Sequence, residues 1–582
     1  MFTKNKSSLV TAFILMSLTG SLLNSSASGA ASSYVEGTDA AAAMFNPLQV
    51  NNFSLQMTDE DFESLRWPNV SWDNEGEWLE TRMSVTLAGK RYGPYVVGVH
   101  LKGAWGSWRD ISGKAAFKVK MDAFVEGQTL LGVSRITLNN MVQDPSYLRE
   151  SISYRLYRNL GIPTPRTGYA NVSLNGIDYG LHLNVETLNK RMLERWGVSS
   201  SHLYKGAVPY FPDLTSGSEW MFAIESGSKT DTSDLTAFIA INDLEGKAWW
   251  DAISARMDME LLTLGWASEI YSGHWDGYVR NLNNYFLNFD KSGKVMMIPW
   301  GVDQTWGGAL GYTDSGAAMP NKCWTYKPCL ALYRQSLAKV SRASKSLNLQ
   351  TMAREIGIAI RSDIIADPFG PGINTATNYQ NNLVWRIGDQ QRVLSSTVQP
   401  FDTTLASIRV NGKIYNPGET IYLAAGTRTA DLQITTSQAS AVAVIQPIGT
   451  LRDGLNSASV VVTSSDKQHV NTNKIQIYVY TNLTTKSTPV YNSNSTVPTF
   501  AGTSSIGLLG TSIMGSTNLK LDIKMARAKN QTITKARSLM ASRVKQLLAS
   551  LSARGIKPVT VTQNVVSSGS VNALQITATY QK

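Results

Sequence analysis

The chain has 582 residues, of which 43% are hydrophobic and 17% charged, and its formal net charge is +11. This length is sufficient for two to four domains with buried cores. Five dispersed histidines and only two cysteines argue against a zinc site. After the first thirty residues no apolar run reaches the length of about 20 residues that a transmembrane helix needs. The sequence also has no nucleic-acid recognition motif, so we expect no nucleic-acid partner.

The amino terminus is typical of a secretory signal. Lys4 and Lys6 precede an apolar run from Leu9 to Leu18, and a small polar stretch ends at Ala30. We therefore predict a signal peptide over residues 1–30, cleaved near Ala30, and a flexible leader over 31–44. The mature protein is then expected to be secreted, at the cell surface or periplasmic.

Residues 45–398 are predicted to form one α+β domain. Strands are expected from Met83, Tyr95, Ala116 and Arg135, because apolar residues there alternate or run together. In the third of these strands, Lys118 and Lys120 share one face. Asp144 and Pro145 predict a helix start, and Asn175-Gly176 predicts the turn of a hairpin.

The second half of this domain is predicted to be mainly helical. A helix from Met257 to Tyr271 leads into a polar stretch, and further helical patterns occupy roughly 329–365 and 376–394. Cys323 and Cys329 are separated by five residues. In an exported protein we predict a disulfide between them, against the alternative of two reduced cysteines.

The composition changes near Pro400. A β-sandwich is predicted over residues 399–492, a Ser/Thr/Gly-rich linker over 493–515, and a small α+β module over 516–582. Residues 501–582 contain eleven basic residues and one acid, Asp522. This charge favours an anionic envelope polymer as partner, although a merely soluble, charged surface explains it equally well.

The stretch from Tyr271 to Gly308 contains the residue types that phosphoryl transfer from a nucleotide requires. Asp276 is followed five residues later by Asn281, and Asp303 follows an apolar strand. One acid can accept the proton of the attacking hydroxyl, while an amide and a second acid can hold Mg²⁺ on the phosphates. Because this spacing is common by chance, the neighbouring stretches decide the interpretation.

Five stretches resemble the spore-coat CotH kinase family, and they occur in the order expected of it. They are Leu101-Lys-Gly-Ala-Trp-Gly-Ser with residues 114–122, then 131–140 with 144–150, 161–166, 174–186 with 203–206, and the stretch 271–308. Together they span roughly residues 80–310, over a third of the chain. Their order is more specific than any single motif.

The resemblance implies an atypical, two-lobed protein-kinase-like domain that binds ATP and Mg²⁺ between its lobes. It would phosphorylate Ser/Thr side chains of extracellular or cell-surface proteins. By position Asp276 would be the catalytic base and Asp303 a metal ligand. The metal-binding amide would come from Asn281, which has the kinase spacing, or from Asn284, which fits the family pattern better.

A kinase also needs a cation on the phosphates that is held by a carboxylate. Lys114, Lys118 and Lys120 are all candidates for this cation, and Glu150 and Glu186 for the carboxylate. The alternative is that these residues form a solvated strand face and exposed ion pairs. His274 is expected to be structural, in the place of the kinase histidine.

One departure from the family pattern bears on function. The family usually has Trp-Asp-x-Asp where this chain has Trp300-Gly-Val-Asp303, so Gly301 replaces the first acid. If that acid is the metal ligand, the protein is a pseudokinase that serves as a surface adhesin or scaffold. If the second acid, Asp303, is the ligand, nothing is lost. AMP transfer, or glycoside hydrolysis by the pair Asp276 and Asp303, are weaker hypotheses.

Overall fold

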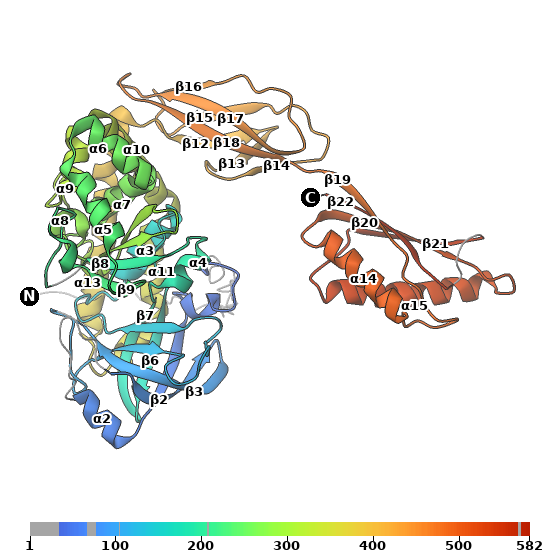
Figure 1. The fold of residues 1–582 in the computed structure, drawn as a ribbon, viewed down its shortest axis with the longest axis horizontal. Coiled ribbons are helices and arrows are strands. Elements are labelled where there is room, and N and C mark those ends of the chain that lie inside the picture. The colour runs from blue at the N-terminus through green and yellow to red at the C-terminus, as the bar shows by residue number, and fades with distance from the viewer. Residues whose placement is uncertain (1–33, 67–76, 104, 207–208, 568–571, 582) are drawn as a thin grey trace, which may run out of the picture. The chain divides into compact units, whose positions relative to one another are not determined.

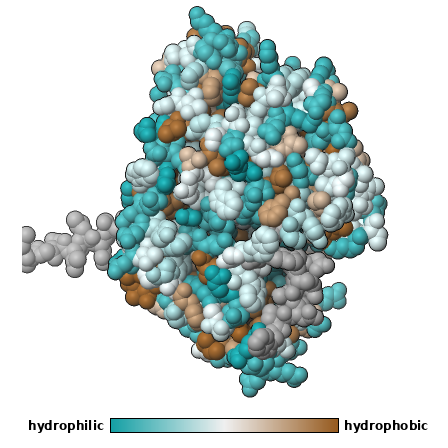
Figure 2. Space-filling view, turned by 90° about the vertical axis from the view of Figure 1, so that its left-hand side faces the viewer, coloured by the Kyte–Doolittle hydropathy of each residue, from teal (hydrophilic) through white to brown (hydrophobic). Residues whose placement is uncertain are grey.

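A computed structural model describes residues 34–66, 77–103, 105–206, 209–567 and 572–581 (Figure 1). The chain divides into two compact units, Met1–Tyr333 with Ala343–Arg392 and Arg334–Arg342 with Val393–Lys582. The predicted signal peptide lies outside the described residues. Among the helices that are described, none combines the length and apolarity required to cross a bilayer. The face drawn in Figure 2 is a mixed surface on which hydrophobic residues occur in small groups among hydrophilic ones.

The first unit begins with a closed barrel whose strand order is β1-β2-β3-β4-β5-β7-β6. The strands are β1 (Val50–Gln56), β2 (Leu79–Leu87), β3 (Lys90–Lys102), β4 (Ala116–Lys120), β5 (Arg135–Asn139), β6 (Thr167–Leu174) and β7 (Ile177–Glu186). Apolar side chains alternate into the core, for example Leu101, Val119 and Leu138. A parallel pairing of β1 with β6 closes the barrel, which the sequence did not predict.

The strand and turn predictions for this region are confirmed. β6 and β7 form the expected hairpin, with Asn175 and Gly176 at φ values of 50° and 80°. Helix α3 (Arg149–Asn159) begins five residues after Asp144, later than predicted. The reason is that the Asp144 carboxylate first closes a turn, accepting the N–H groups of Ser146 (3.0 Å) and Arg149 (2.8 Å).

The predicted flexible leader is wrong for its described part. From Tyr34 onward the segment packs against the first unit, and residues Ala42–Phe45 form a short 3-10 helix. Glu36 forms ion pairs with Arg155 (2.6 Å) and Arg158, and Met44 and Phe45 are buried. Charged residues of the leader therefore find partners that a single-sequence pattern does not reveal.

A four-stranded sheet and a set of helices complete the first unit. The sheet order is β11-β10-β8-β9, formed by β8 (His202–Gly206), β9 (Ala223–Ser226), β10 (Tyr285–Phe289) and β11 (Val295–Pro299). The helices are α2 (Asp59–Arg66), α4 (Lys190–Arg195), α5 (Ser233–Ile239), α6 (Gly246–Arg256), α7 (Met259–Ser272), α8 (Tyr278–Asn281), α9 (Ala318–Thr325), α10 (Lys327–Leu347), α11 (Leu349–Ala359), α12 (Arg361–Ala366) and α13 (Ile373–Val398). Cys323 and Cys329 form the predicted disulfide.

The second unit contains two sheets that share one hydrophobic core. One sheet has the order β13-β12-β15 and the other β14-β18-β17-β16. Their strands are β12 (Leu405–Val410), β13 (Lys413–Tyr415), β14 (Ile421–Leu423), β15 (Leu432–Thr436), β16 (Val442–Ile445), β17 (Gly454–Thr463) and β18 (Val470–Val479). This is the arrangement of a sandwich, with buried residues alternating along β14 and along parts of β17 and β18.

The carboxy-terminal residues form a mixed sheet with two helices. The sheet order is β19-β22-β20-β21, formed by β19 (Asn482–Ser487), β20 (Thr517–Ala526), β21 (Thr560–Val566) and β22 (Gln575–Gln581). The predicted linker is wrong, because much of it forms helix α14 (Phe500–Ile513), whose Ile506, Leu509 and Ile513 join the core with α15 (Ile533–Ser552). Strand β19 also belongs to this sheet and not to the predicted sandwich.

Candidate active site

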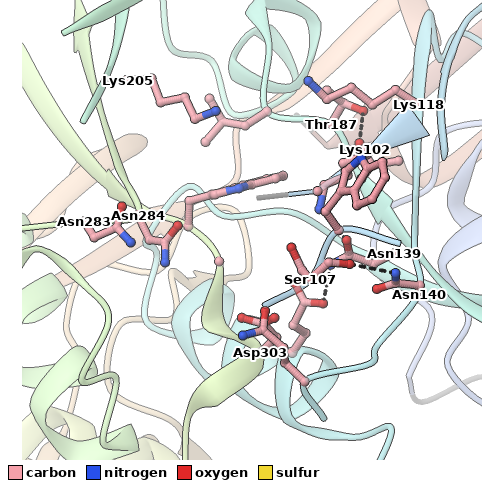
Figure 3. A pocket seen from close by; sticks show the side chains of 18 of the residues that line it. Lys102, Ser107, Lys118, Asn139, Asn140, Thr187, Lys205, Asn283, Asn284 and Asp303 are labelled. Atoms are coloured by element: carbon pink, nitrogen blue, oxygen red, sulfur yellow. Dashed lines mark hydrogen bonds between the residues drawn. The ribbon is translucent and has the colours of Figure 1, made fainter. Parts of the chain in front are cut away.

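A cavity of about 710 Å³ lies in the first unit, against the outer face of the barrel strands β3, β4 and β5. In these strands the apolar side chains point into the barrel, so the alternate side chains face outward. The outward residues that line the cavity include His100, Lys102, Lys118, Thr137 and Asn139. The facing wall comes from β8, β10 and the segments that flank β10 and β11 (Figure 3).

Lys102, Asn139 and Glu150 form a connected group at one end of the cavity. The Lys102 ammonium donates to the Asn139 side-chain oxygen, and the Asn139 amide donates to Glu150 Oε2 at 2.7 Å. Lys102 ends β3, Asn139 ends β5 and Glu150 lies in the first turn of α3. Glu150, which was a predicted site residue, is therefore linked to Lys102 through the side-chain amide of Asn139.

Burial controls the protonation of this group. Burial lowers the pKa of Lys102, and the charges of Glu150 and Asp303 only partly oppose this effect. Burial raises the pKa of Glu150, and the nearby Asp303 charge raises it further. The pKa of Asp303 is also raised, first by burial, against the opposing charge of Lys102. Each shift favours the neutral form, so an ionic ligand that brings countercharge would stabilise the ionised side chains.

Asp276 is held by three amides on the facing wall. Its Oδ1 accepts from Asn281 (2.7 Å) and Asn283 (3.0 Å), and its Oδ2 accepts from Asn284 (2.9 Å). An amide that donates through its nitrogen turns its oxygen away from the acceptor. The structure thus brings the predicted residues Asp276, Asn281 and Asn284 together, and it adds Asn283.

The local backbone explains this arrangement. Helix α7 ends at Gly273, whose φ of 66° is left-handed, and the chain then turns through His274 into α8. His274 is fully buried, which lowers its pKa to about 4, and its uncharged ring donates from Nε2 to the Trp300 carbonyl at 3.0 Å. His274 is therefore a structural residue, and it joins the Asp276 loop to the end of β11.

Asp303 faces the same cavity from the segment after β11 (Figure 3). Among the contacts described for the chain, no side chain donates a hydrogen bond to its carboxylate. Its neighbour Gly301 is left-handed, with φ 56° and ψ 48°, and its N–H donates to the Tyr154 hydroxyl at 3.1 Å. A half-buried acid that faces a cavity and has no described side-chain donor suits a metal ion or a ligand.

The oxygen atoms of the cavity can be compared with the ligands that Mg²⁺ requires. The described residues contain no group of three or more His, Cys, Asp or Glu side chains that could hold a metal ion by themselves. Mg²⁺ in nucleotide sites is usually bound by one or two carboxylates together with phosphate oxygens and water. Asp303 and the amide oxygens of the Asp276 loop fit that smaller requirement.

Three predicted site residues lie outside the cavity lining. Lys114 is buried in an ion pair with Asp367, and Tyr147 donates to the same carboxylate at 3.0 Å. Glu186 pairs with Arg166 (2.9 Å) and Arg195 (2.6 Å). Lys120 occupies an outward position of β4, but only Lys118 of the two reaches the cavity.

The sequence analysis missed Lys102, Asn139, Asn283 and Lys205, all of which line the cavity. A signal for Lys102 was present. It lies two residues after His100 in an alternating strand, on the face opposite Leu101, and directly before the glycine turn that carries the family resemblance. The position of the other cavity lysines depends on strand register. Thr137 of β5 pairs with Lys118, and Phe286 of β10 pairs with Lys205.

Comparison with known proteins supports the predicted resemblance. Residues 99–339 match the family described as CotH kinase protein. The chain is similar to the inner spore coat protein H of Bacillus subtilis (strain 168), with 24% identity over 200 residues, which are 32% of this chain and 53% of that protein. It is also similar to an inner spore coat protein H-like protein of the same organism, with 27% identity over 93 residues, which are 16% of this chain and 29% of that protein.

Residues 99–339 therefore match the CotH family, and the matched part includes the cavity residues from His100 onward. The matched part spans about half of the first relative's length and less than a third of the second's. Residues after 339, which include the sandwich and the carboxy-terminal module, lie beyond the family match.

Proposed function

We propose that the CotH domain is a Mg²⁺-dependent protein kinase that transfers the γ-phosphoryl group of ATP to a Ser/Thr hydroxyl. Its substrate would be a coat or surface protein, since the relatives named above are spore coat proteins. The observation that carries the proposal is the placement of Asp276 and the Lys102–Asn139–Glu150 group on facing walls of one cavity. Asp303 faces the same cavity.

The proposed reaction is a direct displacement at phosphorus. The substrate hydroxyl oxygen forms a bond to the γ-phosphorus, the bond from that phosphorus to the β–γ bridging oxygen breaks, and ADP leaves. The hydroxyl proton goes to Asp276. A carboxylate has about four acceptor positions, and three of those on Asp276 are occupied by the asparagine amides. One position on Oδ2 is left for the incoming proton.

The remaining residues would bind and orient the nucleotide. Lys102, which Asn139 ties to Glu150, is placed to contact phosphate oxygens, as the lysine–glutamate pair of a kinase does. Asp303 and an amide oxygen from the Asp276 loop would hold Mg²⁺, which neutralises charge on the phosphates when bound. The barrel and the helical part would then correspond to the two lobes of an atypical protein kinase.

Label transfer tests this proposal directly. Protein cleaved near Ala30 is incubated with Mg²⁺, a mixture of coat proteins and ATP labelled at either the γ or the α position. Label from the γ position that Asp276→Ala and Asp303→Ala both abolish is the expected result. Label from the α position would mean AMP transfer instead.

A second candidate function rests on the carboxy-terminal module. Of the eleven basic residues between 501 and 582, nine are exposed, Arg543 is buried and Lys582 is outside the described residues. The single acid of this stretch is Asp522, and its Oδ2 lies 3.6 Å from the Nζ of Lys524. We propose that this surface binds an anionic polymer of the envelope and so retains the protein at the cell or spore surface.

The test uses long-chain polyphosphate as the polyanion. Binding by the full chain should weaken as salt is raised, because exposed charges are screened over about 8 Å at physiological ionic strength. Lys529→Gln, Lys535→Gln and Arg537→Gln together should weaken binding, while Asp276→Ala should leave it unchanged. Retention of binding in the triple variant would refute the assignment to this module.

A further inference from the structure

We infer that the site holds a single Mg²⁺ ion, with Asp303 as its only carboxylate ligand and the Asn284 side chain in the place of a second acid. The inference rests on the proposed function and specifies its metal stoichiometry. It depends on the surroundings of Gly301, on the constraints upon Asn284 and on the positions of the other carboxylates of the cavity.

The space beside Gly301 is already filled. A β-carbon added at Gly301 would lie 2.6 Å from Asn284 Cγ and 2.6 Å from Asn284 Oδ1. Contacts this short do not occur between real side chains, so one of the groups would have to move. The φ of 56° is also unfavourable for a residue with a side chain. An acid at this position would therefore need both a different backbone and a displaced Asn284.

Asn284 is not free to move aside. Its amide donates to Asp276 Oδ2 at 2.9 Å and to the Asp276 carbonyl at 3.0 Å. The main-chain carbonyl oxygen of Asn284 accepts a hydrogen bond from the Trp300 N–H at 2.8 Å. The next residues along the two strands, Tyr285 in β10 and Pro299 in β11, are paired in the sheet. The neighbouring strands hold Asn284 and Gly301 side by side, so the Asn284 side chain occupies the space that a side chain at position 301 would need in this backbone.

The other acids of the cavity are unsuited to a second metal ion. Asp276 already accepts three amide hydrogen bonds, and Glu150 accepts from Asn139 and is only 4% exposed. Glu225 lies on β9, and β8 and β10 separate it from β11 in the sheet. With a strand spacing of about 4.8 Å, β9 is about 14 Å from β11. Asp303 is left as the one carboxylate for an ion on the phosphates.

This assignment gives Lys102 a distinct role. Charge on the transferring phosphates must be neutralised, and a site with two metal ions does so with two divalent charges. In a site with one ion, the Lys102 ammonium supplies the additional positive charge. Its placement agrees with this role, because Lys102 lines the cavity and Asn139 ties it to Glu150.

The experiment counts Mn²⁺ ions in the nucleotide complex of the mature chain by electron paramagnetic resonance, with a non-hydrolysable ATP analogue. We expect one bound Mn²⁺ per complex, and loss of that ion from the protein in Asp303→Asn. Two bound ions in the wild-type complex, or an unchanged ion in Asp303→Asn, would overturn the inference. Lys120→Met is the matched control, since Lys120 does not line the cavity, and it should keep one ion.

Two substitutions at Gly301 test the steric part. Gly301→Ala and Gly301→Asp should both lower the midpoint of thermal unfolding, because both introduce the same β-carbon beside Asn284. Neither should gain a second Mn²⁺. If Gly301→Asp bound a second ion without loss of stability, the space would be open and the inference would be wrong.

The outcomes separate this inference from the proposed function. If the wild-type chain binds no nucleotide with either Mg²⁺ or Mn²⁺, the kinase proposal itself fails. If the chain binds nucleotide and transfers γ-label with two ions present, the kinase proposal stands and only the single-metal inference is lost.

Discussion

The first unit contains two kinds of buried charge, and they differ in how completely they are compensated. Outside the cavity, Lys114 is paired with Asp367, and Glu186 lies between two arginines. Inside the cavity, Asp303 has no described side-chain donor, and Lys102 reaches Glu150 only through Asn139. The first kind is compensated by charged partners within the protein, whereas the second is compensated only in part by the contacts described.

This difference separates a structural charge from a functional one. All of these residues looked alike in the sequence, as charged positions in or beside apolar elements. A buried charge that is paired can hold two segments together, and removing one partner leaves the other uncompensated. A charge that faces a cavity without full compensation is a candidate for a functional residue. Substitutions in the two groups should therefore affect different measurements.

The largest effect is expected for Asp276→Ala, measured as the rate of γ-label transfer. A general base contributes roughly 10²- to 10⁴-fold to such rates, so we expect a loss in that range. The unfolding midpoint should change little, because the freed asparagine amides face a water-accessible cavity. A variant that lost stability instead of activity would place Asp276 among the structural charges.

Lys114→Met should have the opposite signature. The Lys114 side chain is 4% exposed and that of Asp367 is fully buried. Breaking one side of such a pair typically costs about 3–5 kcal/mol of the free energy of unfolding. Urea denaturation of the full chain measures this change. Nucleotide affinity of the folded fraction should stay close to the wild-type value.

A second variant keeps this prediction distinct from a simple loss of packing. In Lys114→Met/Asp367→Leu both charges are removed, so the uncompensated carboxylate disappears. Stability should then recover in part, because the buried unpaired charge is gone, while the Tyr147 hydroxyl and the N–H groups of Leu181 and Phe369 lose their acceptor. No recovery in the double variant would mean that the other donors to Asp367, which are the Tyr147 hydroxyl and the N–H groups of Leu181 and Phe369, need its carboxylate as much as Lys114 does.

Much of the secondary structure could be predicted from periodicity and turn residues. The strands of the barrel, the hairpin at Asn175-Gly176 and the helix before His274 follow local rules that a single sequence displays. The helix within 500–513 was missed because its glycines, serines and threonines are typical of a linker. Its burial is decided by the sheet that it covers, and that information is not local.

The candidate site was predicted unevenly for a related reason. Asp276, Asn281, Asn284 and Asp303 are close in sequence or follow one hairpin, so spacing was informative. The choice among the lysines depended on barrel register and on which helix Glu150 belongs to. Lys114 pairs with a residue 253 positions away, and no pattern around Lys114 indicates Asp367. Long-range pairing of this kind is visible only in the folded chain.

Lys102→Met tests whether the lysine inside the cavity contacts the nucleotide. A hydrogen bond to a charged group is worth about 1.5–3 kcal/mol, which corresponds to a loss of about tenfold to a hundredfold in nucleotide affinity. Isothermal titration calorimetry with ATP and Mg²⁺ measures it, and Lys120→Met is the control from an adjacent part of the barrel. Equal losses in both variants would show a general effect of positive charge and not a specific contact.

The smallest expected effect concerns Glu186 and appears in the pH dependence of stability. Burial alone would raise the pKa of Glu186, but the Arg166 and Arg195 guanidiniums outweigh this effect and hold the pKa below its ordinary value. The ordinary value in an unfolded chain is about 4.3. As the pH falls through this region, the unfolded chain takes up the proton first, so the pair stabilises the fold above that value and progressively less below it. Wild-type protein should therefore lose stability more steeply below about pH 5 than Glu186→Gln, measured by urea unfolding at a series of pH values. Parallel curves for the two proteins would mean that the arginines do not depend on the Glu186 charge.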